Sequence, residues 1–275
     1  MRGFKVVVVM LCVMVSGACA QFNQGTAAVP VVASHLDRIA ARGELVVGMS
    51  GNQPPLNFIS KSGELMGLEV DLAKQMADAM GVNLRTQSMA FADLLPALES
   101  GRVDLVLSGM TITPARNMKS MFVGPYFLSG KAILTREQTL ADIRNPSEMN
   151  RPNLKIVALR GSTSQALVED EIPDAKLSLA QDYDEAIQQL IRNEADIFIA
   201  DYPICIISVF RYPDEGLISL ITPMTFEPLG IGLPAGDPLY ANWVENFLML
   251  LDGSGELEEL TNHWFGESSW LEDLP

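Results

Sequence analysis

The sequence contains few of the residues from which metal centres and catalytic triads are built. Its 275 residues include three cysteines and two histidines, and His35 and His263 stand near opposite ends of the chain. No Cys/His spacing typical of a metal site appears, and the two histidines do not combine with serine and aspartate into a triad. We therefore expect no bound metal, no cofactor and no catalytic residue of these kinds.

Two of the three cysteines lie in a segment that we expect the mature protein to lack. Residues 1–20 have a basic start, an apolar run over 6–15 and the small-residue end Ala18-Cys19-Ala20, which is the pattern of a secretory signal peptide. The run is shorter than a transmembrane helix requires. We expect cleavage after residue 20 and a periplasmic protein, with lipid anchoring at Cys19 as the alternative. Only Cys205 then remains, so an intramolecular disulfide is excluded and a buried inert thiol is expected.

Positive charge is scarce as well. Nineteen lysines and arginines stand against 34 acidic residues, for a formal net charge of −15. This balance argues against nucleic acid and against anionic membrane surfaces as partners. Hydrophobic residues make up 48% of the chain, which suffices for one large or two smaller cores. The net charge does not select a ligand, because a site inside an acidic protein can be locally positive.

One stretch carries several polar groups suited to a ligand. The apolar run over residues 103–107 predicts a buried strand, and Ser108-Gly109-Met110-Thr111 follow at its end. A helical turn led by Pro114 then presents Arg116. Small residues at the end of a strand allow a ligand close to the backbone, and hydroxyls with a guanidinium suit a carboxylate. The alternative is an ordinary strand–turn–helix with a surface arginine.

A weak internal repeat indicates two similar halves. The pairs Phe91 and Tyr183, Leu98 and Leu190, and Asp104 and Asp196 are each 92 residues apart, in segments that share a helix–turn–strand pattern. We therefore predict two α/β lobes.

The same offset places Asp201 at the end of the second lobe's strand, opposite Gly109 of the first. Ligands of open α/β sheets bind beyond the carboxyl ends of the strands. Facing lobes would put Arg116 on one side of a cleft and Asp201 on the other, which suits a zwitterion. The alternative for Asp201 is a helix N-cap before Pro203.

The second lobe has a strand and loop like those of the first. The strand predicted over 155–159 is followed by Arg160-Gly161-Ser162-Thr163-Ser164 and by a helix from about residue 165. Amides and hydroxyls at such a helix start form an anion site, whereas the alternative is a capped helix with Arg160 in solvent. Extended segments at 126–130 and 225–230 predict two crossings between the lobes. The predicted division is a flexible leader over 21–33, lobe 1 over 34–127 and 229–275, and lobe 2 over 128–228.

With these motifs the chain resembles the periplasmic solute-binding proteins of amino-acid ABC importers. The resemblance implies an α/β, type II periplasmic binding protein fold: two lobes, each a mixed sheet flanked by helices, joined by two hinge crossings. It also implies a small-molecule amino acid as ligand, a membrane permease as partner and a monomer. The motifs that carry it are Gly67-Leu68-Glu69-Val70-Asp71-Leu72, Phe91 with Leu95-Pro96-Ala97-Leu98, Val103-Asp104, Thr111-Ile112-Thr113 with Arg116, Gly161-Ser162-Thr163, Ala195-Asp196 and Asp201.

The resemblance also implies roles for individual residues. Arg116 would clamp the α-carboxylate of the ligand, helped by Thr111 and Thr163. Asp201 would hold the α-ammonium. The other residues that it assigns to the ligand are Ser108 and Gly109 beside the ammonium, Phe91 stacked on the side chain, Ser162 beside Thr163, and Gln53 and Arg160 reading the side chain.

The sequence departs from some members of the family in ways that bear on the ligand. Binders of basic amino acids carry an acid in the first loop, where this chain has Ser50-Gly51, so a lysine or arginine ligand is disfavoured. Arg160 would complement an acidic or amide side chain, which gives glutamate, aspartate and glutamine as the order of preference. We expect Arg160→Ala to change the preferred ligand.

Two other functions compete with import. The fold also resembles periplasmic cyclohexadienyl dehydratases, whose chemistry needs a general acid over the substrate. We would expect that acid just after Asp201, where Tyr202-Pro203-Ile204-Cys205 offers none. A sensory protein that feeds a membrane receptor would use the same site, and the sequence does not separate it from an importer.

Overall fold

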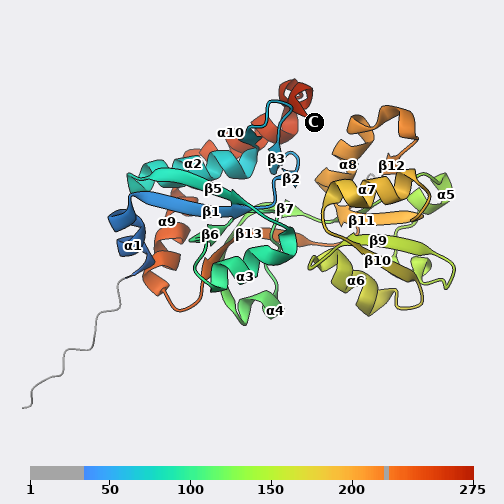
Figure 1. Ribbon diagram of the computed structural model, residues 1–275, viewed down its shortest axis with the longest axis horizontal. Coiled ribbons are helices and arrows are strands. Elements are labelled where there is room, and N and C mark those ends of the chain that lie inside the picture. The colour runs from blue at the N-terminus through green and yellow to red at the C-terminus, as the bar shows by residue number, and fades with distance from the viewer. Residues whose placement is uncertain (1–33, 220–222) are drawn as a thin grey trace, which may run out of the picture. The chain divides into compact units, whose positions relative to one another are not determined.

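The computed structural model describes residues 34–219 and 223–275. These residues build a two-lobe α/β fold around two five-stranded mixed sheets (Figure 1). A small three-stranded sheet lies in the order β2-β3-β4, from β2 (Asn52–Gln53), β3 (Asn57–Ile59) and β4 (Leu65–Met66). The predicted signal peptide, the cleavage or lipidation site and the leader lie outside the described residues.

The first sheet has the strand order β5-β1-β6-β13-β7. Strand β1 pairs in parallel with β5 and with β6, and β13 runs antiparallel to its neighbours. The predicted strand over 103–107 is confirmed, though its regular part is shorter. The strands are β1 (Glu44–Met49), β5 (Asn83–Ser88), β6 (Leu105–Val106), β7 (Ser120–Ser129) and β13 (Glu227–Pro234).

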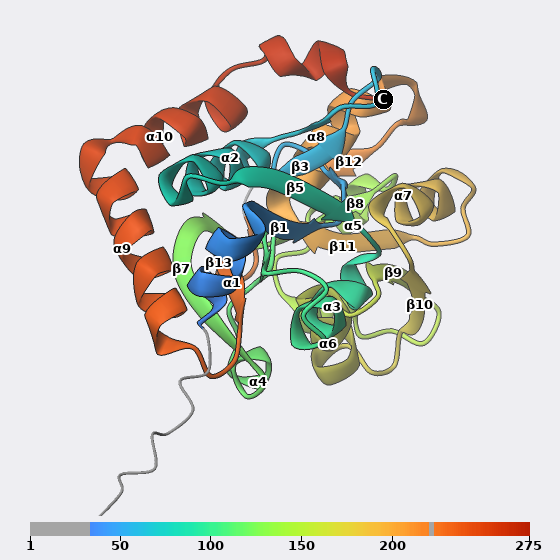
Figure 2. The same ribbon diagram turned by 60° about the vertical axis from the view of Figure 1, so that its left-hand side comes forward.

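Helices on both faces of the first sheet bury its apolar side chains. The first helix is capped as its sequence dictates, because the Ser34 side chain accepts from the backbone of Asp37 and Gly43 ends the helix in the left-handed region. The long helix α9 packs against β7, and the short helix α10 that follows it packs against α2 (Figure 2). The helices are α1 (His35–Arg42), α2 (Leu68–Met80), α3 (Leu94–Glu99), α4 (Pro114–Asn117), α9 (Pro238–Ser254) and α10 (Glu256–Thr261), with short turns η1 (Phe91–Asp93), η4 (Asn262–Gly266) and η5 (Ser269–Asp273).

The second sheet repeats the order of the first, as β10-β9-β11-β8-β12. In the first sheet β1 lies between the parallel strands β5 and β6, and the antiparallel strand β13 comes next. In the second sheet β9 lies in the same way between β10 and β11, and the antiparallel strand β8 comes next. This correspondence confirms the two similar lobes. Its elements are β8 (Lys131–Thr135), β9 (Lys155–Leu159), β10 (Lys176–Ala180), β11 (Ile197–Asp201), β12 (Ile218–Ser219), α5 (Gln138–Ala141), α6 (Thr163–Glu171), α7 (Tyr183–Ile191), α8 (Tyr202–Arg211), η2 (Pro146–Met149) and η3 (Pro213–Glu215).

Strands β7 and β13 form the two predicted crossings. They pair antiparallel from Glu227 opposite Ser129 to Pro234 opposite Ser120. The predicted lobe boundaries both fall near one end of this ribbon, where Leu128 pairs with Pro228, and they remain a prediction. Among residues 34–219 and 223–275, no helix has both the length and the apolar character needed to cross a bilayer.

A cluster of buried apolar side chains continues from one lobe into the other. It joins Phe91 and Leu94 of the first lobe to Tyr183, Phe198 and Cys205 of the second. The pair Phe91 and Tyr183, matched by the sequence repeat, therefore meets in one core. This cluster lies beneath the polar residues that the sequence assigns to the ligand.

The two crossings approach so closely that Gly130 has no room for a side chain. A Cβ atom there would lie 2.3 Å from the carbonyl oxygen of Thr225. We expect Gly130→Ala to lower the free energy of unfolding by about 1–3 kcal/mol, since overpacking displaces backbone. Gly253→Ala is the control, because a Cβ there meets nothing within 4 Å and should stabilise the helix by about 0.5–1 kcal/mol. Urea unfolding of both variants measures this, and equal effects would contradict the account.

Candidate functional site

Arg116 lies where the two lobes meet. The turn α4 that carries it is capped by Thr113, whose hydroxyl accepts from the backbone N–H of Arg116. Its guanidinium donates to the carbonyl of Thr111 at 2.8 Å and to the carbonyl of Gly161, in the other lobe, at 3.1 Å. Its Cζ lies 5.7 Å from the centre of the Phe91 ring, which is a cation–π distance. Burial lowers the pKa of Arg116, and the nearby carboxylates of Asp201 and Glu227 oppose this shift.

Asp201 ends strand β11 and pairs with a lysine that the sequence reading missed. Asp201 and Lys131 are direct cross-strand partners in β11 and β8, and Lys131 Nζ lies 2.7 Å from Asp201 Oδ1. Both side chains are almost fully buried, at 6% and 2% exposure. Asp201 occupies the N-cap position of α8, but its side chain makes no capping hydrogen bond. Burial raises the pKa of Asp201, and Lys131 offsets part of this rise.

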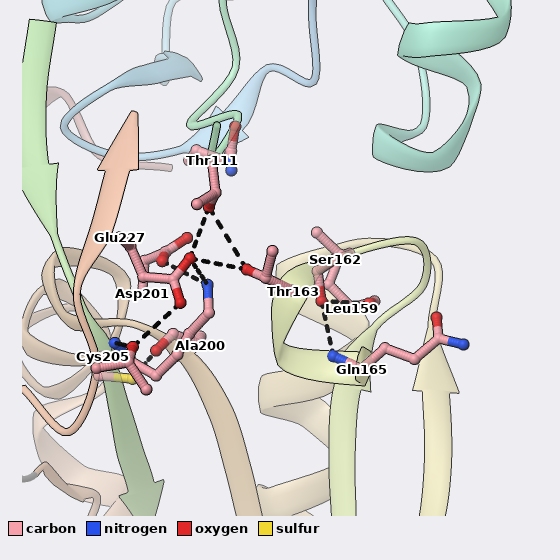
Figure 3. A network of polar contacts seen from close by, with 12 residues as sticks. Thr111, Leu159, Ser162, Thr163, Gln165, Ala200, Asp201, Cys205 and Glu227 are labelled. Carbon is pink, nitrogen blue, oxygen red and sulfur yellow. Dashed lines mark hydrogen bonds and ion pairs between the residues drawn. The ribbon is translucent and has the colours of Figure 1, made fainter. Parts of the chain in front are cut away.

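Glu227 is the second missed residue, and it connects both lobes to the hinge. Its Oε2 accepts from the hydroxyl of Thr111 at 2.8 Å and from the hydroxyl of Thr163 at 3.0 Å (Figure 3). The same oxygen lies 3.6 Å from Lys131 Nζ, and Oε1 accepts from Thr225 at 3.1 Å. Burial favours the neutral acid, but Lys131 and the threonine hydroxyls outweigh it and lower the pKa of Glu227. Glu227 is therefore ionised at neutral pH.

A third buried carboxylate, Glu69 of α2, fixes the backbone at Gly109. Its Oε1 accepts from the amide of Gly109 at 2.6 Å and from the hydroxyl of Tyr126, and its Oε2 accepts from Asn57. Burial raises the pKa of Glu69, while these donors act in the opposite direction. Gly109 adopts a φ of +55°, and a Cβ atom there would lie 3.0 Å from Gln53 Nε2. The glycine thus allows the close approach of the Gln53 side chain, and the close approach of a ligand remains a prediction.

Gln53, Ser108 and Tyr183 form a polar contact across the lobes. The Ser108 hydroxyl donates to Gln53 Oε1 at 2.6 Å, and Gln53 Nε2 donates to the Tyr183 hydroxyl at 3.1 Å. The pKa of Tyr183 is raised well above its ordinary value by burial and then by the charge of Asp201. Tyr183 therefore stays protonated at neutral pH and can donate to a further acceptor.

Two residues of the predicted set lie at the edge of this network. Ser162 caps α6, because its hydroxyl accepts from the amide of Gln165 at 3.2 Å and donates to the carbonyl of Leu159 at 2.7 Å. This cap starts the helix at Thr163, two residues before the predicted start, and directs the Thr163 hydroxyl toward Glu227 (Figure 3). The side chain of Arg160 is exposed.

The structure thus brings Arg116, Asp201, Thr111, Thr163 and Gln53 into one polar interface, with Ser108, Gly109 and Phe91 beside them. The residues missed from sequence are Lys131, Glu227 and Glu69. Lys131 and Glu227 carry no short-range signal of burial, because pairing between distant strands buries them. Among residues 34–219 and 223–275, no group of three or more His, Cys, Asp or Glu side chains could hold a metal ion.

Cys205 is buried below this interface, as its sequence environment predicts. Its sulfur lies 3.9 Å from the carbonyl oxygen of Ala200, and burial raises the pKa of the thiol. We expect no reaction of Cys205 with a thiol reagent at pH 8 in the native protein, and full reaction in urea. A chain that begins at residue 21 contains no other cysteine. The absorbance of the product that the thiol reagent releases therefore measures the reacted fraction of Cys205 directly. Rapid labelling without urea would contradict its burial.

Two facing α/β lobes joined by two crossings, with charged groups from both lobes at their contact, define a type II periplasmic binding protein fold. The sequence matches the model of the bacterial extracellular solute-binding proteins, family 3, over residues 45–267. The chain belongs to this family, whose members bind solutes outside the cytoplasm.

Individual relatives include binding proteins and one enzyme. The chain is 28% identical to the ABC transporter glutamine-binding protein GlnH of Bacillus subtilis, over 75% of each chain. It is 24% identical to the cyclohexadienyl dehydratase of Pseudomonas aeruginosa, over 86% of this chain and 88% of that one. Among solved structures, a binding component of an ABC transporter from Wolinella succinogenes complexed with lysine is 34% identical at a TM-score of 0.77, covering 84% of this chain and 99% of that one. The ancestral amino acid-binding protein AncCDT-1, described as a precursor of cyclohexadienyl dehydratase, is 33% identical at a TM-score of 0.76, over 85% of this chain and all of that one.

Proposed function

We propose that this protein captures a polar α-amino acid between its two lobes for ABC-type import. The observation that carries the proposal is the placement of Arg116 and Asp201. They come from different lobes, they interact electrostatically, and hydroxyl groups that can donate to an anion surround them. Arg116 would bind the α-carboxylate, and Asp201 would bind the α-ammonium.

The charges of the interface support a zwitterionic ligand. Arg116 and Lys131 supply two positive charges, and Asp201 and Glu227 supply two negative ones. A ligand without net charge leaves this balance unchanged, whereas a ligand with an acidic side chain needs a further cation, which Arg160 would supply. Both poles of the site are desolvated, so each charge-assisted bond to the ligand contributes more than it would in water.

We propose that the side chain of the ligand is acidic or an amide, with glutamate, aspartate and glutamine as the order of preference. Gln53 offers a buried amide that already pairs across the lobes. Arg160 is next to Gly161, where a Cβ atom would lie 3.2 Å from Ala92 of the other lobe, so Arg160 flanks the contact between the lobes. The resemblance to a glutamine-binding protein agrees with this class, and the first loop carries Ser50-Gly51 in place of an acid.

The remaining parts of the proposal concern the protein's surroundings. We propose a periplasmic location through the signal peptide, a membrane permease as partner, and a monomer that presents both lobes to it. Hinge closure over β7 and β13 would couple ligand capture to recognition by the permease, because closure places both lobes in one fixed arrangement.

A thermal-shift screen tests the proposed function. The secreted protein is unfolded and refolded to remove bound ligand, then heated with each of the twenty amino acids, prephenate and arogenate. A ligand that binds the native state raises Tm by mass action. A ligand concentration of 100 times Kd increases the free energy of unfolding by about 2.7 kcal/mol. A shift with one or a few polar amino acids is expected. No shift across the amino acids would contradict the proposal.

A dehydratase is the second candidate function, and one observation favours it. Lys131 and Glu227 form a buried ionisable pair at the interface, beside the residues that would hold a carboxylate. The lowered pKa of Glu227 keeps it ionised at neutral pH, so it cannot serve as the general acid that this chemistry needs. Binding is therefore the function that the geometry supports better. A thermal shift with prephenate or arogenate alone would reverse this order.

The proposed role of Arg160 gives a separate prediction. Because Arg160 is exposed and flanks the contact, Arg160→Ala should change the relative Kd values for glutamate, glutamine and neutral amino acids by about tenfold or less, without abolishing binding. Arg192→Ala, an exposed arginine of the same lobe, is the matched control and should leave the order unchanged. Calorimetric titration of both variants measures this, and an unchanged order in Arg160→Ala would remove Arg160 from the site.

A further inference from the structure

The groups assigned to the ligand already hold a positive and a negative charge from the protein itself. Asp201, expected to bind an ammonium, binds the ammonium of Lys131 at 2.7 Å. Thr111 and Thr163, expected to bind a carboxylate, donate to the carboxylate of Glu227 at 2.8 Å and 3.0 Å. The two charges lie 3.6 Å apart, from Lys131 Nζ to Glu227 Oε2.

We propose that Lys131 and Glu227 act as an internal substitute for the amino acid, which the incoming ligand has to displace. The inference rests on the proposed function, because it takes the roles of Asp201, Thr111 and Thr163 from it. The pair places an ammonium on Asp201 and a carboxylate on Thr111 and Thr163, which are three of the partners that the two ends of an α-amino acid would use. Asp201, Thr111 and Thr163 are thus already contacted by side chains of the protein itself.

The positions of the two residues in the fold explain how the pair connects the lobes. Lys131 begins β8 in the second lobe, immediately after the first crossing, and Glu227 begins β13 in the second crossing. Through one oxygen, Glu227 accepts from Thr111 in the first lobe and from Thr163 in the second. Glu227 therefore connects both lobes to the hinge. Lys131, Thr111 and Glu227 are buried, with Thr111 at 4% and Glu227 at 7% exposure, and Thr163 is half-buried.

Displacement has a cost that appears in the affinity. A ligand carboxylate that takes the Thr111 and Thr163 hydroxyls has to break two charge-assisted hydrogen bonds of Glu227. Hydrogen bonds to charged groups are among the stronger ones, so the internal contact weakens apparent binding by about tenfold or more. The internal contact also favours ligands with two charged ends, since a ligand with only one charged end cannot replace both Lys131 and Glu227.

Two variants of Glu227 separate this role from direct ligand binding. Glu227→Met removes the acceptor, whereas Glu227→Gln keeps an oxygen for the two threonine hydroxyls and removes the charge. Glu194→Met, at an exposed carboxylate of the second lobe, is the matched control. Circular dichroism first establishes that each variant is folded, and Glu227→Gln carries the test if Glu227→Met is not.

Small-angle X-ray scattering of the ligand-free proteins and calorimetric titration with L-glutamate and L-glutamine give the two readouts. We expect a larger radius of gyration for ligand-free Glu227→Met than for wild type and the control, and a Kd about tenfold lower for both Glu227 variants. A Kd raised 100-fold in both variants would make Glu227 a ligand contact and overturn the proposal, as would an unchanged radius in folded Glu227→Met. If wild type binds neither probe nor any amino acid of the thermal screen, the proposed function fails, while the scattering comparison still decides whether Glu227 holds the lobes together.

Discussion

Replacing Arg116 by alanine is expected to raise the Kd for the bound amino acid by at least about 100-fold. Arg116 is the first lobe's arginine at the interface, and its guanidinium already donates to carbonyls of both lobes. Without it, the ligand carboxylate would be buried with hydroxyl donors alone. Truncating one partner of a buried charge pair typically costs about 3–5 kcal/mol, which corresponds to two or more powers of ten in Kd.

Arg102→Ala and Arg116→Lys complete this experiment. Arg102 is an exposed arginine of the same lobe, so its loss should leave Kd unchanged and shows that overall charge is not the cause. Lysine keeps the charge of Arg116 but not the fork that spans Thr111 and Gly161, so an intermediate affinity is expected. Calorimetric titration compares the three variants, and wild-type affinity in Arg116→Ala would show that Arg116 is not part of the site.

The second large effect is expected from Lys131→Met, measured as a loss of stability without ligand. Lys131 is the buried cation within 4 Å of both Asp201 and Glu227, at 2.7 Å and 3.6 Å. Its removal takes from two buried carboxylates the cation that contacts them, which we expect to lower the free energy of unfolding by about 3–5 kcal/mol. Urea unfolding at pH 7 reports the change.

Lys74→Met and a double variant test the cause of this loss. Lys74 is exposed and 3.3 Å from Asp71, so the same substitution there should change stability by less than about 1 kcal/mol. Lys131→Met combined with Asp201→Asn removes both charges of the buried pair, and we expect it to be more stable than Lys131→Met alone. Additive losses in the double variant would mean that the two residues are not coupled.

The sequence predicted the strand ends at Ser108 and Asp201 and the two lobes. An apolar run that ends in small polar residues marks the first strand end, and the repeat at an offset of 92 residues marks the second strand end and the two lobes. Arg116 was found because its type and its distance from a strand end suit a carboxylate. The same signals place Thr111 and Thr163 at the contact.

Lys131 and Glu227 could not be assigned in this way, because their burial depends on pairing between distant strands. Lys131 reads as the solvent-exposed start of an apolar strand until the register of β8 sets it opposite Asp201. Glu227 reads as a polar residue in an extended crossing until β13 brings it beneath Thr111 and Thr163. Glu69 stands in one of the family motifs without an assigned role, whereas the structure buries it on the amide of Gly109.

The most direct test of the central claim is a calorimetric comparison of one amino acid with two analogues. The amino acid that gives the largest thermal shift is titrated beside the same molecule without its α-amino group and the same molecule without its α-carboxylate. If Asp201 and Arg116 hold the two ends, both analogues bind at least about 100-fold more weakly than the amino acid. An analogue that binds as tightly as the amino acid would show that the corresponding end is not recognised, and would contradict the account.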